Sequence, residues 1–399
     1  SDYHRSERSL SFLPEPVDML MFLVVFLSVF IGMHTLFFFR IRVLFMDRAI
    51  VQGLVIAWFA VMILVPMASY LLEARGHDLP ARIAAIIGFY WVGFLFLAFS
   101  ACLLMGFFDG FAWLARALTR LDVPSLSGKV PALAMLGLVA ATCLYGLYEA
   151  KQIRVEHLRI ETGKLPEGVD SLRIAQISDV HLGLILRQSH MKAIIAELEA
   201  LSPDILVCTG DYVDGSLKNL IHLTEYIEAL HPRYGKYAVT GNHEYYAGLE
   251  KSLEFLEKSG FTVLRGEGTT IEGMITIAGV DDADVSGATR TDSAAEADLA
   301  LRALPEVDPA LFTLFLKHRP DVLPATLGRF DLQLSGHTHK GQMFPFDLLV
   351  KRQYPMLSGS HDLGGGARIH INRGVGTWGP PMRIFAPPEI TLIELVRRG

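Results

Sequence analysis

The sequence predicts an all-α membrane segment of four helices, followed by an α/β domain in which helices cover β-sheet. Two observations lead to this fold class. Hydrophobic residues make up 51% of the 399 residues, and they are concentrated in the first 150. From Gln152 onward, short apolar stretches alternate with stretches of helical periodicity, as in α/β domains. We therefore predict a transmembrane domain at residues 1–150 and a second domain at residues 151–399.

Four long apolar runs predict four transmembrane helices. Each run reaches about 18 residues or more, the length that crosses the hydrocarbon core of a bilayer. None of them contains Asp, Glu, Lys or Arg, whereas buried helices of soluble proteins rarely combine this length with a lack of charge. A signal peptide is a poor interpretation of the first run, because the run is too long and no basic segment directly precedes it. The runs are Met19–Phe39, Ile50–Leu72, Ile83–Phe108 and Pro131–Tyr148.

Three features of this segment bear on its function and orientation. His34 lies inside the first run, where a histidine is either a functional group or a hydrogen-bonded packing residue. Residues Gly110–Leu121 show helical spacing of apolar residues, which predicts a short helix in the membrane interface or a solvated loop helix. Basic residues are nearly balanced on the two sides, but Arg40 and Arg42 directly follow the first run. By the positive-inside rule, we expect both termini and the C-terminal domain outside the cytoplasm.

The C-terminal domain alternates predicted strands with predicted helices, which favours sheets covered by helices. The predicted strands are Ile153–Ile160, Leu172–Ile177, Asp204–Cys208, Tyr237–Thr240, Leu311–Leu316 and Phe330–Leu334. Three further short strands are expected between Phe261 and Val280, and the tail from Ile369 to Val396 is mostly strand-like. The predicted helices are Gln188–Leu201, Asn219–Leu230, Leu249–Ser259 and Ser293–Leu304.

Polar residues with metal-binding side chains follow several of these strands, where open α/β sheets bind their ligands. They are Asp179 and His181, then Asp211, then Asn242 and His243, then His318, and finally His337 and His339. Each cluster alone is common, but five of them at strand ends in one domain are not a coincidence. Carboxylate, amide and imidazole groups without thiolate suit Mn, Fe or Zn. We expect two divalent transition-metal ions, with Asp211 as the ligand that bridges them.

Cysteine and net charge add little to this interpretation. The three cysteines have no metal-ligand spacing and form no visible disulfide framework. The 36 Lys and Arg residues against 42 Asp and Glu residues give a net charge of −6. This balance argues against a general nucleic-acid binder, so no nucleic-acid partner is expected.

The order of the polar clusters resembles the calcineurin-like metallophosphoesterase superfamily. The resemblance rests on Asp179-x-His181, Gly210-Asp211, Gly241-Asn242-His243-Glu244, His318 and Gly336-His337-x-His339. The segments Asn372–Thr377 and Pro387–Glu389 are similar to the C-terminal part of bacterial membrane-linked phosphoesterases. The resemblance covers the chain from Ile153 to its end. It implies an α/β sandwich of two sheets flanked by helices, in a protein of the bacterial inner or plasma membrane.

The resemblance also implies which residues hold each metal ion. One ion would take Asp179, His181, Asp211 and His339 as ligands. The other would take Asp211, Asn242, His318 and His337. A hydroxide that bridges the two ions would then hydrolyse a phosphoester or pyrophosphate bond.

His243 and Asp214 are the implied catalytic pair. His243 resembles the family's non-ligand histidine, which stabilises or protonates the leaving group, and Asp214 would fix its tautomer. Gly215 stands where the Ser/Thr protein phosphatases carry an arginine, which argues against a phosphoprotein substrate. Glu244 is expected to be a structural hydrogen-bond acceptor. Lys340 departs from the family's usual Gly-Gly-Gln and is either a substrate contact or a solvated side chain.

The segment from Met343 to Met356 is unusually apolar for the rim of a site. Exposed apolar residues beside a site indicate a binding surface, here for the acyl part of an amphiphilic phosphate. Phe344 and Phe346 are the substrate-binding candidates in this segment. The alternative is that the segment packs under the strands that follow it.

The predicted function is a membrane-anchored, metal-dependent phosphoesterase that acts on a lipid-linked phosphate, such as a phospholipid or a sugar-nucleotide lipid. Hydrolysis of UDP-diacylglucosamine in the lipid A pathway, performed by some members of the superfamily, is a specific case. One alternative is a broad-specificity phosphodiesterase or nucleotide hydrolase that the anchor merely localises. Another is a non-catalytic membrane protein that keeps the fold to bind a partner. The last predicts a lost ligand, whereas all seven ligand positions are filled.

Overall fold

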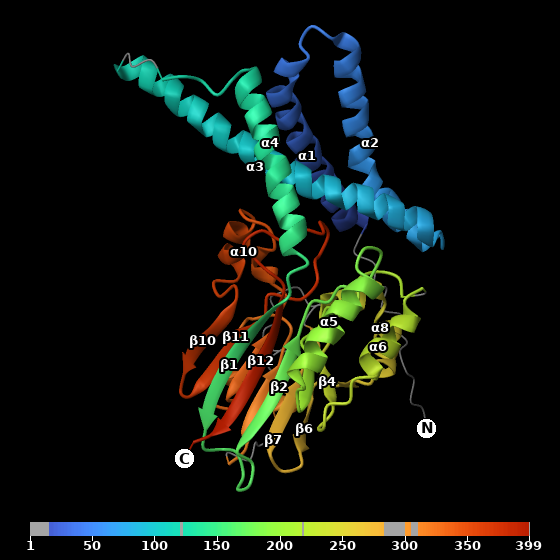
Figure 1. Ribbon diagram of the computed structural model, residues 1–399, viewed down its shortest axis with the longest axis vertical. Coiled ribbons are helices and arrows are strands. Elements are labelled where there is room, and N and C mark those ends of the chain that lie inside the picture. Colours follow the sequence, from blue (N-terminus) through green and yellow to red (C-terminus); the bar gives the residue numbers. More distant parts are fainter. Residues whose placement is uncertain (1–15, 120–122, 218, 283–299, 305–309, 399) are drawn as a thin grey trace, which may run out of the picture.

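The computed structural model describes residues 16–119, 123–217, 219–282, 300–304 and 310–398. Its N-terminal part contains the helices α1 (Pro16–Ile41), α2 (Ala49–Ala74), α3 (Asp78–Thr119) and α4 (Lys129–Glu149). All four are long and apolar enough to span a membrane, which confirms the four predicted helices. Figure 1 shows them above the sheets, with the C-terminal ends of α1 and α3 pointing away from the sheets.

Helix α3 differs from the prediction for this part of the chain. Its 42 residues form one continuous helix, about 63 Å long at 1.5 Å per residue. Residues 110–119 continue α3, so the prediction of a separate short helix there is wrong. The reason is that Ala, Leu and Arg favour helix after the apolar run has ended. Since the hydrocarbon core is only about 30 Å thick, α3 must tilt strongly or extend beyond it.

Four polar side chains, those of His34, Trp91, Arg40 and Asp109, form hydrogen bonds within the helical segment. His34 Nδ1 donates to the carbonyl oxygen of Phe30 at 2.8 Å, and its Nε2 accepts from Trp91 Nε1 at 3.0 Å. Both ring nitrogens are therefore used in packing contacts, which favours the packing interpretation of His34. Arg40 forms an ion pair of 3.0 Å with Asp109, which connects the end of α1 to α3.

In the C-terminal part of the chain, the described strands form two six-stranded sheets. The first sheet has the order β1-β12-β2-β3-β4-β5, and the second has the order β10-β11-β9-β8-β7-β6. The strands of the first sheet are β1 (Arg154–Thr162), β2 (Ser171–Ile177), β3 (Ile205–Cys208), β4 (Lys236–Ala238), β5 (Thr262–Val263) and β12 (Glu389–Arg397). Those of the second are β6 (Glu267–Ile271), β7 (Ile275–Gly279), β8 (Phe312–Leu316), β9 (Leu332–Ser335), β10 (Gly359–Gly364) and β11 (Ala367–Ile371). Strands β2 to β5 are parallel, as are β7, β8, β9 and β11.

The main core lies between the two sheets. Ile174 and Val207 of the first sheet belong to the same buried cluster as Ile277 and Leu332 of the second. Helices α5 (Gln188–Leu201), α6 (Thr224–Glu228) and α8 (Leu249–Lys258) contribute side chains to a further cluster with the first sheet. Figure 1 shows these helices on the outer side of that sheet. The domain is therefore the two-sheet α/β sandwich flanked by helices that was expected.

Most predicted elements are present, and α5 has the predicted ends. The predicted helix Asn219–Leu230 is shorter, with one 3₁₀ turn (Ile221–Leu223) before α6. Strand β10 was not expected, because its sequence is rich in glycine and polar residues. Residues 372–388, expected to be mostly strand, form the loop between β11 and β12. Most of the helix predicted at Ser293–Leu304 lies outside the described residues.

The helical segment packs directly against the loop between β11 and β12. A Cβ atom added to Gly146 of α4 would lie 3.2 Å from Ile384 Cγ1 and 3.3 Å from the Arg383 oxygen. The Arg383 amide donates to the Gly146 oxygen at 3.0 Å. A Cβ atom on Gly93 of α3 would lie 3.0 Å from Met382 Sδ. Glycine at these two helix positions allows the close approach.

A second contact joins the start of α3 to the loop that follows β2. Arg187 donates to both carboxylate oxygens of Asp78, at 2.6 and 3.2 Å. Leu184 of the same loop packs in one cluster with Ala81 and Ala85 of α3. The anchor thus contacts a loop that begins with predicted metal ligands.

Gly146→Leu is predicted to loosen the contact between α4 and the sandwich. The new side chain must displace Ile384 and the Arg383 carbonyl, and overpacking of this kind costs about 1–3 kcal/mol. We expect faster amide hydrogen exchange in residues 380–386 of the detergent-solubilised protein. Gly137→Leu, also in α4, is the matched control because a Cβ atom there meets nothing within 4 Å. Equal exchange rates in the two variants would contradict this packing.

Candidate metal centre

The predicted ligands meet where the carboxyl ends of strands from both sheets come together. Asp179 and His181 follow β2, Asp211 follows β3, Asn242 follows β4, His318 follows β8, and His337 and His339 follow β9. Six of these seven side chains are buried, and that of His337 is half-buried. The sandwich thus brings together residues that are up to 160 positions apart in the chain (179 to 339).

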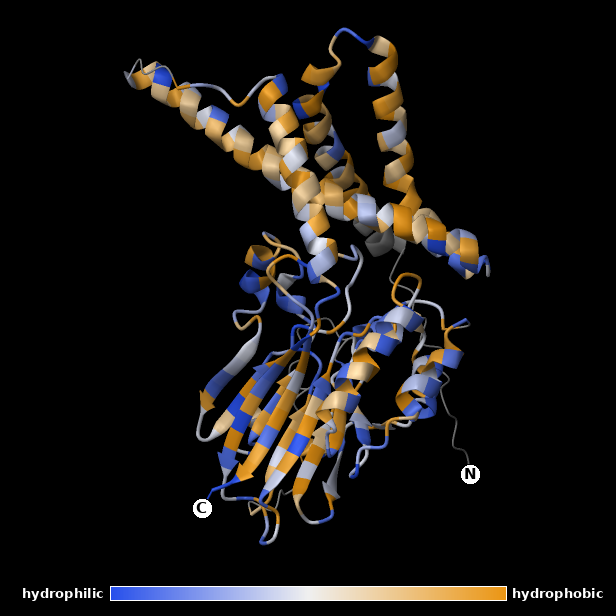
Figure 2. Ribbon diagram, in the orientation of Figure 1, coloured by the Kyte–Doolittle hydropathy of each residue, from blue (hydrophilic) through white to orange (hydrophobic). Residues whose placement is uncertain are grey.

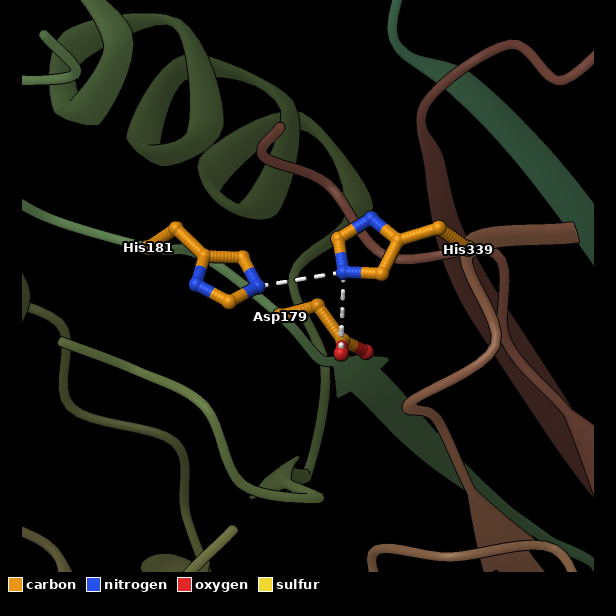
Figure 3. Close-up of side chains that lie close together, drawn as sticks. All are labelled: Asp179, His181 and His339. Carbon is orange, nitrogen blue, oxygen red and sulfur yellow. Dashed lines mark hydrogen bonds and ion pairs between the residues drawn. The ribbon is translucent and has the colours of Figure 1, made fainter. Parts of the chain in front are cut away.

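Asp179, His181 and His339 form the first ligand group, shown in Figure 3. His339 Nε2 lies 3.3 Å from Asp179 Oδ1 and 3.0 Å from His181 Nε2. One ligand atom from each residue lies within 4.8 Å of the others. Two imidazole nitrogens and a carboxylate oxygen this close together form a place for a cation.

Asp211, His318 and His337 form the second ligand group. His318 Nε2 lies 3.1 Å from Asp211 Oδ2 and 3.1 Å from His337 Nδ1. The other ring nitrogen, His318 Nδ1, donates to the Thr209 oxygen at 2.7 Å, which directs Nε2 into the group. Asp211 Oδ2 is also 4.0 Å from His181 Nε2 of the first group. The Asp211 carboxylate therefore lies between the two groups, where a bridging ligand would have to be.

The backbone of the ligand residues is unusual. The φ angle is 50° at Asp179 and His181, 52° at Asp211, 71° at His337 and 48° at His339. Ten described non-glycine residues have positive φ, so half of them belong to this set. Each such conformation costs on the order of 1–3 kcal/mol and persists where the surrounding structure enforces it, most often at functional sites.

Two motif glycines provide the space in which the loops approach each other. A Cβ atom on Gly241 would overlap Asp211 Oδ1, and one on Gly336 would overlap Asp179 Oδ2. Any other residue at these positions would push a predicted ligand out of place.

Glu244 holds the loop that carries Asp211. Its carboxylate accepts the backbone N–H groups of Asp211 and Tyr212 at 3.0 and 2.8 Å. It also accepts those of Val213 and Gly241 at 3.3 and 2.6 Å. Burial raises the pKa of this carboxyl group to about 7. Glu244 is thus a structural hydrogen-bond acceptor, in agreement with the prediction.

Charge is distributed unevenly over the imidazoles of the metal-free centre. Burial and neighbouring imidazolium charge lower the pKa of His181 and of His337 to about 3. Burial alone would also lower the pKa of His318, but the Asp211 carboxylate raises it to about 10. Neutral imidazole and ionised carboxylate are the forms that bind metal ions. The Asp211 carboxylate therefore attracts positive charge, and the neighbouring His181 and His337 offer the neutral nitrogens that a cation needs.

His243 and Asp214 form a hydrogen-bonded pair beside the first group. His243 Nδ1 lies 3.0 Å from Asp214 Oδ1, which leaves Nε2 as the free ring nitrogen. The His243 ring is edge-on to that of His181, with the centroids 4.6 Å apart. Burial alone would lower the pKa of His243, but Asp211 and Asp214 together raise it to about 9. In the metal-free centre these carboxylates therefore favour the protonated imidazole, which is the form that can donate a proton.

The residues of both groups fit divalent cations. The side-chain oxygen of Asn242 and Nδ1 of His181 are buried without a hydrogen-bond partner in the described part of the chain. An unpaired buried polar atom is costly, and a bound ion at Asn242 would relieve that cost. The donor set of oxygen and imidazole nitrogen suits Mn, Fe or Zn equally. His181, Asp214 and His243 form a third close group, but the hydrogen bond between Asp214 and His243 already uses two of its members.

Comparisons with known proteins agree with this geometry. Residues 172–341 match the family model described as calcineurin-like phosphoesterase. A metallophosphoesterase of Aquifex aeolicus is 41% identical over 259 residues, which are 64% of this chain and 96% of that protein. A transmembrane protein with metallophosphoesterase domain from Danio rerio is 30% identical over 342 residues, which are 82% of this chain and 76% of that protein. The chain belongs to the calcineurin-like phosphoesterase family.

Membership of the family establishes the class of reaction. The protein is a metal-dependent phosphoester hydrolase. With four apolar helices and a transmembrane relative, it is also a membrane protein. Calcineurin-like phosphoesterases usually bind two divalent metal ions, and the two ligand groups offer places for them.

A cavity of about 1240 Å³ opens beside His243. Part of its lining comes from the end of α2, including Tyr70 and Glu73. Tyr246 and Trp378 line it as well, with ring centroids 5.3 and 6.2 Å from that of His243. Nothing in the sequence pointed to these four residues, because single aromatic or acidic side chains carry no signal without their neighbours.

The three predicted substrate contacts do not line this cavity in the described part of the chain. Lys340 is half-exposed directly after His339. The ring of Phe346 lies against Phe96 of α3, and that of Phe344 lies against Phe385, each with centroids 6.1 Å apart. Both rings stay exposed, which excludes the alternative that the whole segment packs under the following strands. A substrate role for Lys340, Phe344 and Phe346 remains a prediction.

Arg383 is a further residue that the sequence did not indicate. Its side chain is fully buried, and its guanidinium donates to the oxygens of Gly376 and Ala386 at 2.7–2.9 Å. Its Nη2 also lies 3.2 Å from His339 Nδ1. Burial lowers the pKa of Arg383 to about 9. Because arginine is seldom fully buried, only the folded chain reveals that it orders this loop beside a predicted ligand.

Asp211→Asn is predicted to lose bound metal and activity together. The amide keeps the shape of the side chain but removes the negative charge that lies between the two groups. Purified wild-type protein reconstituted with Mn or Zn should hold about two ions per chain, and the variant about one or fewer. Elemental analysis by mass spectrometry measures this ratio.

Asp331→Asn is the control for this experiment. Asp331 forms a 2.7 Å ion pair with Lys164 and belongs to neither ligand group, so its metal content should stay at the wild-type value. A reconstituted wild-type protein without metal would show that the assignment is wrong.

Proposed function

We propose that this phosphoesterase hydrolyses an amphiphilic, lipid-linked phosphate at a dinuclear metal centre. The observation that supports the substrate class is the composition of the cavity wall. The cavity is lined by His243 and Asp214 together with the end of the membrane helix α2. A headgroup presented at the membrane surface would meet both, whereas a freely soluble ester does not need a membrane helix in the lining.

The sheet register supports a site close to the bilayer. Strands β1 and β12 run parallel, and β12 runs antiparallel to β2. The carboxyl end of β2, which leads to Asp179, therefore lies at the same end of the sheet as Arg154, the first residue of β1. Helix α4 ends at Glu149, and five residue steps span at most about 18 Å. The active site is thus held at the membrane end of the domain.

Two cations would occupy the centre in this proposal. One would be held by Asp179, His181, Asp211 and His339, and the other by Asp211, Asn242, His318 and His337. Bound cations would supply Lewis-acid polarisation of the phosphoryl group and lower the pKa of a bound water from 15.7 to about 7. The protein supplies the negative charge of Asp179 and Asp211 and the fixed orientation of the imidazoles.

His243 is the proposed general acid. Its Nδ1 is taken by Asp214, so the proton that it can give away is the one on Nε2. A protonated imidazole of raised pKa, adjacent to the cavity, suits the protonation of a leaving alkoxide. Asp214 acts through His243 by fixing its tautomer and orientation.

The cavity wall next to Asp214 carries a carboxylate. Glu73 of α2 accepts the amide of Ser216 at 3.1 Å, and a Cβ atom on Gly215 would lie 3.2 Å from Glu73 Oε2. Glycine at this position leaves the room that the Glu73 side chain uses. Gly215 and Glu73 thus put a carboxylate near the position where the Ser/Thr protein phosphatases carry an arginine, which supports the expectation that phosphoproteins are not the substrates.

We further propose that the membrane is the bacterial inner or plasma membrane, with the catalytic domain outside the cytoplasm. Arg40 and Arg42 lie at the end of α1 that points away from the sheets, and basic residues favour the cytoplasmic side. Alkaline phosphatase fused to the C-terminus tests this arrangement, since the fusion is active only outside the cytoplasm. An inactive fusion at normal expression would reverse the orientation.

His243→Ala is predicted to keep the metal ions but to lower turnover by about 100-fold or more. The reason is that a poor leaving group then departs without a proton donor. Asp214→Asn should show a smaller loss of the same kind. With a nitrophenyl ester, whose leaving group needs no proton, both losses should shrink.

Metal analysis of the same preparations separates the two possible roles of His243. If His243→Ala removes a metal ion, the residue is a ligand and its assignment as acid is wrong. If the loss of turnover is equal for good and poor leaving groups, the proton-donor role is excluded.

The substrate class is tested by comparing two phosphodiesters in detergent micelles, one short and soluble, the other attached to a diacylglycerol. We expect kcat/KM to be at least about tenfold higher for the lipid, or about 1.4 kcal/mol of transition-state stabilisation. Trp378→Ala should reduce the preference, since the Trp378 side chain lines the cavity beside His243. Equal efficiency on both substrates, unchanged by Trp378→Ala and by Phe346→Ser, would favour the alternative of a broad phosphodiesterase or nucleotide hydrolase that the anchor merely localises.

A further inference from the structure

Six exposed apolar side chains gather in two short segments of the catalytic domain. They are Phe344, Phe346, Leu348, Leu349, Trp378 and Phe385, each between 40% and 64% exposed, and we refer to them as the apolar rim. Among the other described residues from 154 onward, the exposed large apolar side chains are Ile221, Tyr246 and Leu327. Two thirds of such residues therefore lie in the rim. On the surface of a soluble protein, exposed apolar side chains are usually scattered, whereas a contiguous patch of them indicates a binding surface.

The rim is continuous with the membrane helices. The ring of Phe385 lies 6.1 Å from that of Tyr145 in α4, and Phe346 lies at the same distance from Phe96 in α3. Helix α10 (Asp347–Gln353), which carries two of the rim residues, lies next to the lower end of α4 in Figure 1. Figure 2 shows both hydrophobic and hydrophilic residues in α10, below the largely hydrophobic membrane helices.

The depth of the rim follows from the length of α4. Its 21 residues span about 31 Å, close to the roughly 30 Å of a hydrocarbon core. Its last turns carry Tyr145, Tyr148 and Glu149, a mixture of aromatic and charged residues typical of the membrane–water interface. Since Phe385 contacts Tyr145, one turn before the end of α4, the rim lies at the level of that interface.

The charges of α10 suit the same location. Leu348 and Leu349 are exposed, and Lys351 and Arg352 follow them in the last turn, also exposed. Apolar side chains next to basic ones are the pattern of segments that lie in the headgroup region of a membrane. The two cations can pair with anionic lipid headgroups.

We propose that the apolar rim is inserted into the headgroup region of the bilayer that α1 to α4 span. The occupant of this surface is lipid, because the rim continues the outer surfaces of α3 and α4, which lipid already covers. This contact is independent of the substrate and adds a second attachment of the catalytic domain to the membrane. Trp378 belongs to the rim and also lines the catalytic cavity, so the inserted surface reaches the entrance of the site.

Depth-dependent fluorescence quenching tests the proposal on the full chain in phosphatidylcholine vesicles. The native cysteines Cys102, Cys143 and Cys208 are buried, so a thiol-reactive fluorophore labels a new cysteine selectively. Leu348→Cys and Leu349→Cys place the label on the rim. Gly163→Cys, at the far end of β1 where an added Cβ meets nothing within 4 Å, is the matched control.

Lipid brominated near the headgroup end of its acyl chains should quench the labels at positions 348 and 349 about twofold or more, and leave position 163 unchanged. Quenching at 348 and 349 no greater than at 163 would show that the rim faces water and overturn the proposal. A rim covered by a second copy of the chain would also overturn it. In that case the labels would be unquenched, and dilution of the protein into more lipid would shift their emission to the red.

Discussion

The centre depends on holding one buried carboxylate, that of Asp211, between two groups of histidines. Its Oδ2 faces His318 and its Oδ1 accepts the amide of His243 at 2.9 Å, so both oxygens are used. A buried charge is stable only when it is paired and hydrogen-bonded. Glu244 secures the same loop by accepting the Asp211 amide, although its own burial makes it a costly group. Residues of α7 (Asn242–Ala247) and His318 at the end of β8 therefore hold the loop after β3 in place.

Neither sheet alone contains a complete ligand group. The first group combines Asp179 and His181 of the first sheet with His339 of the second, and the second group combines Asp211 with His318 and His337. The core between the sheets sets the distance between them. It therefore also sets the distance between ligand residues that come from different sheets. Left-handed backbone at five ligand positions costs free energy locally. Burial of large side chains such as Ile174 and Leu332, worth about 1.5–3 kcal/mol each, is the type of interaction that offsets that cost.

The candidate ligands that the structure brings together could be selected from the sequence because their chemistry is local. Each follows an apolar strand, and residue type alone shows that Asp179 or His318 can bind a metal ion. The cavity and the buried arginine could not be predicted, because Glu73, Trp378 and Arg383 act through contacts with distant parts of the chain. Helix α3 was predicted too short for another reason. The polar residues after Phe108 suggested an end, yet the Ala, Leu and Arg residues that follow are good helix formers.

The membrane helices contribute to the site and do not act as a tether alone. A tether would contact the domain only near residues 150–153, but α2 and α3 contact the two loops that begin with predicted ligands. Glu73 accepts the amide of Ser216 after β3, and Asp78 pairs with Arg187 after β2. Glu73 and Asp78 flank the short turn between α2 and α3. Both loops are therefore held by the same part of the membrane anchor. With α4 fixed to the Arg383 loop as well, the orientation of the centre relative to the bilayer is set by helix packing and not by the flexibility of a linker.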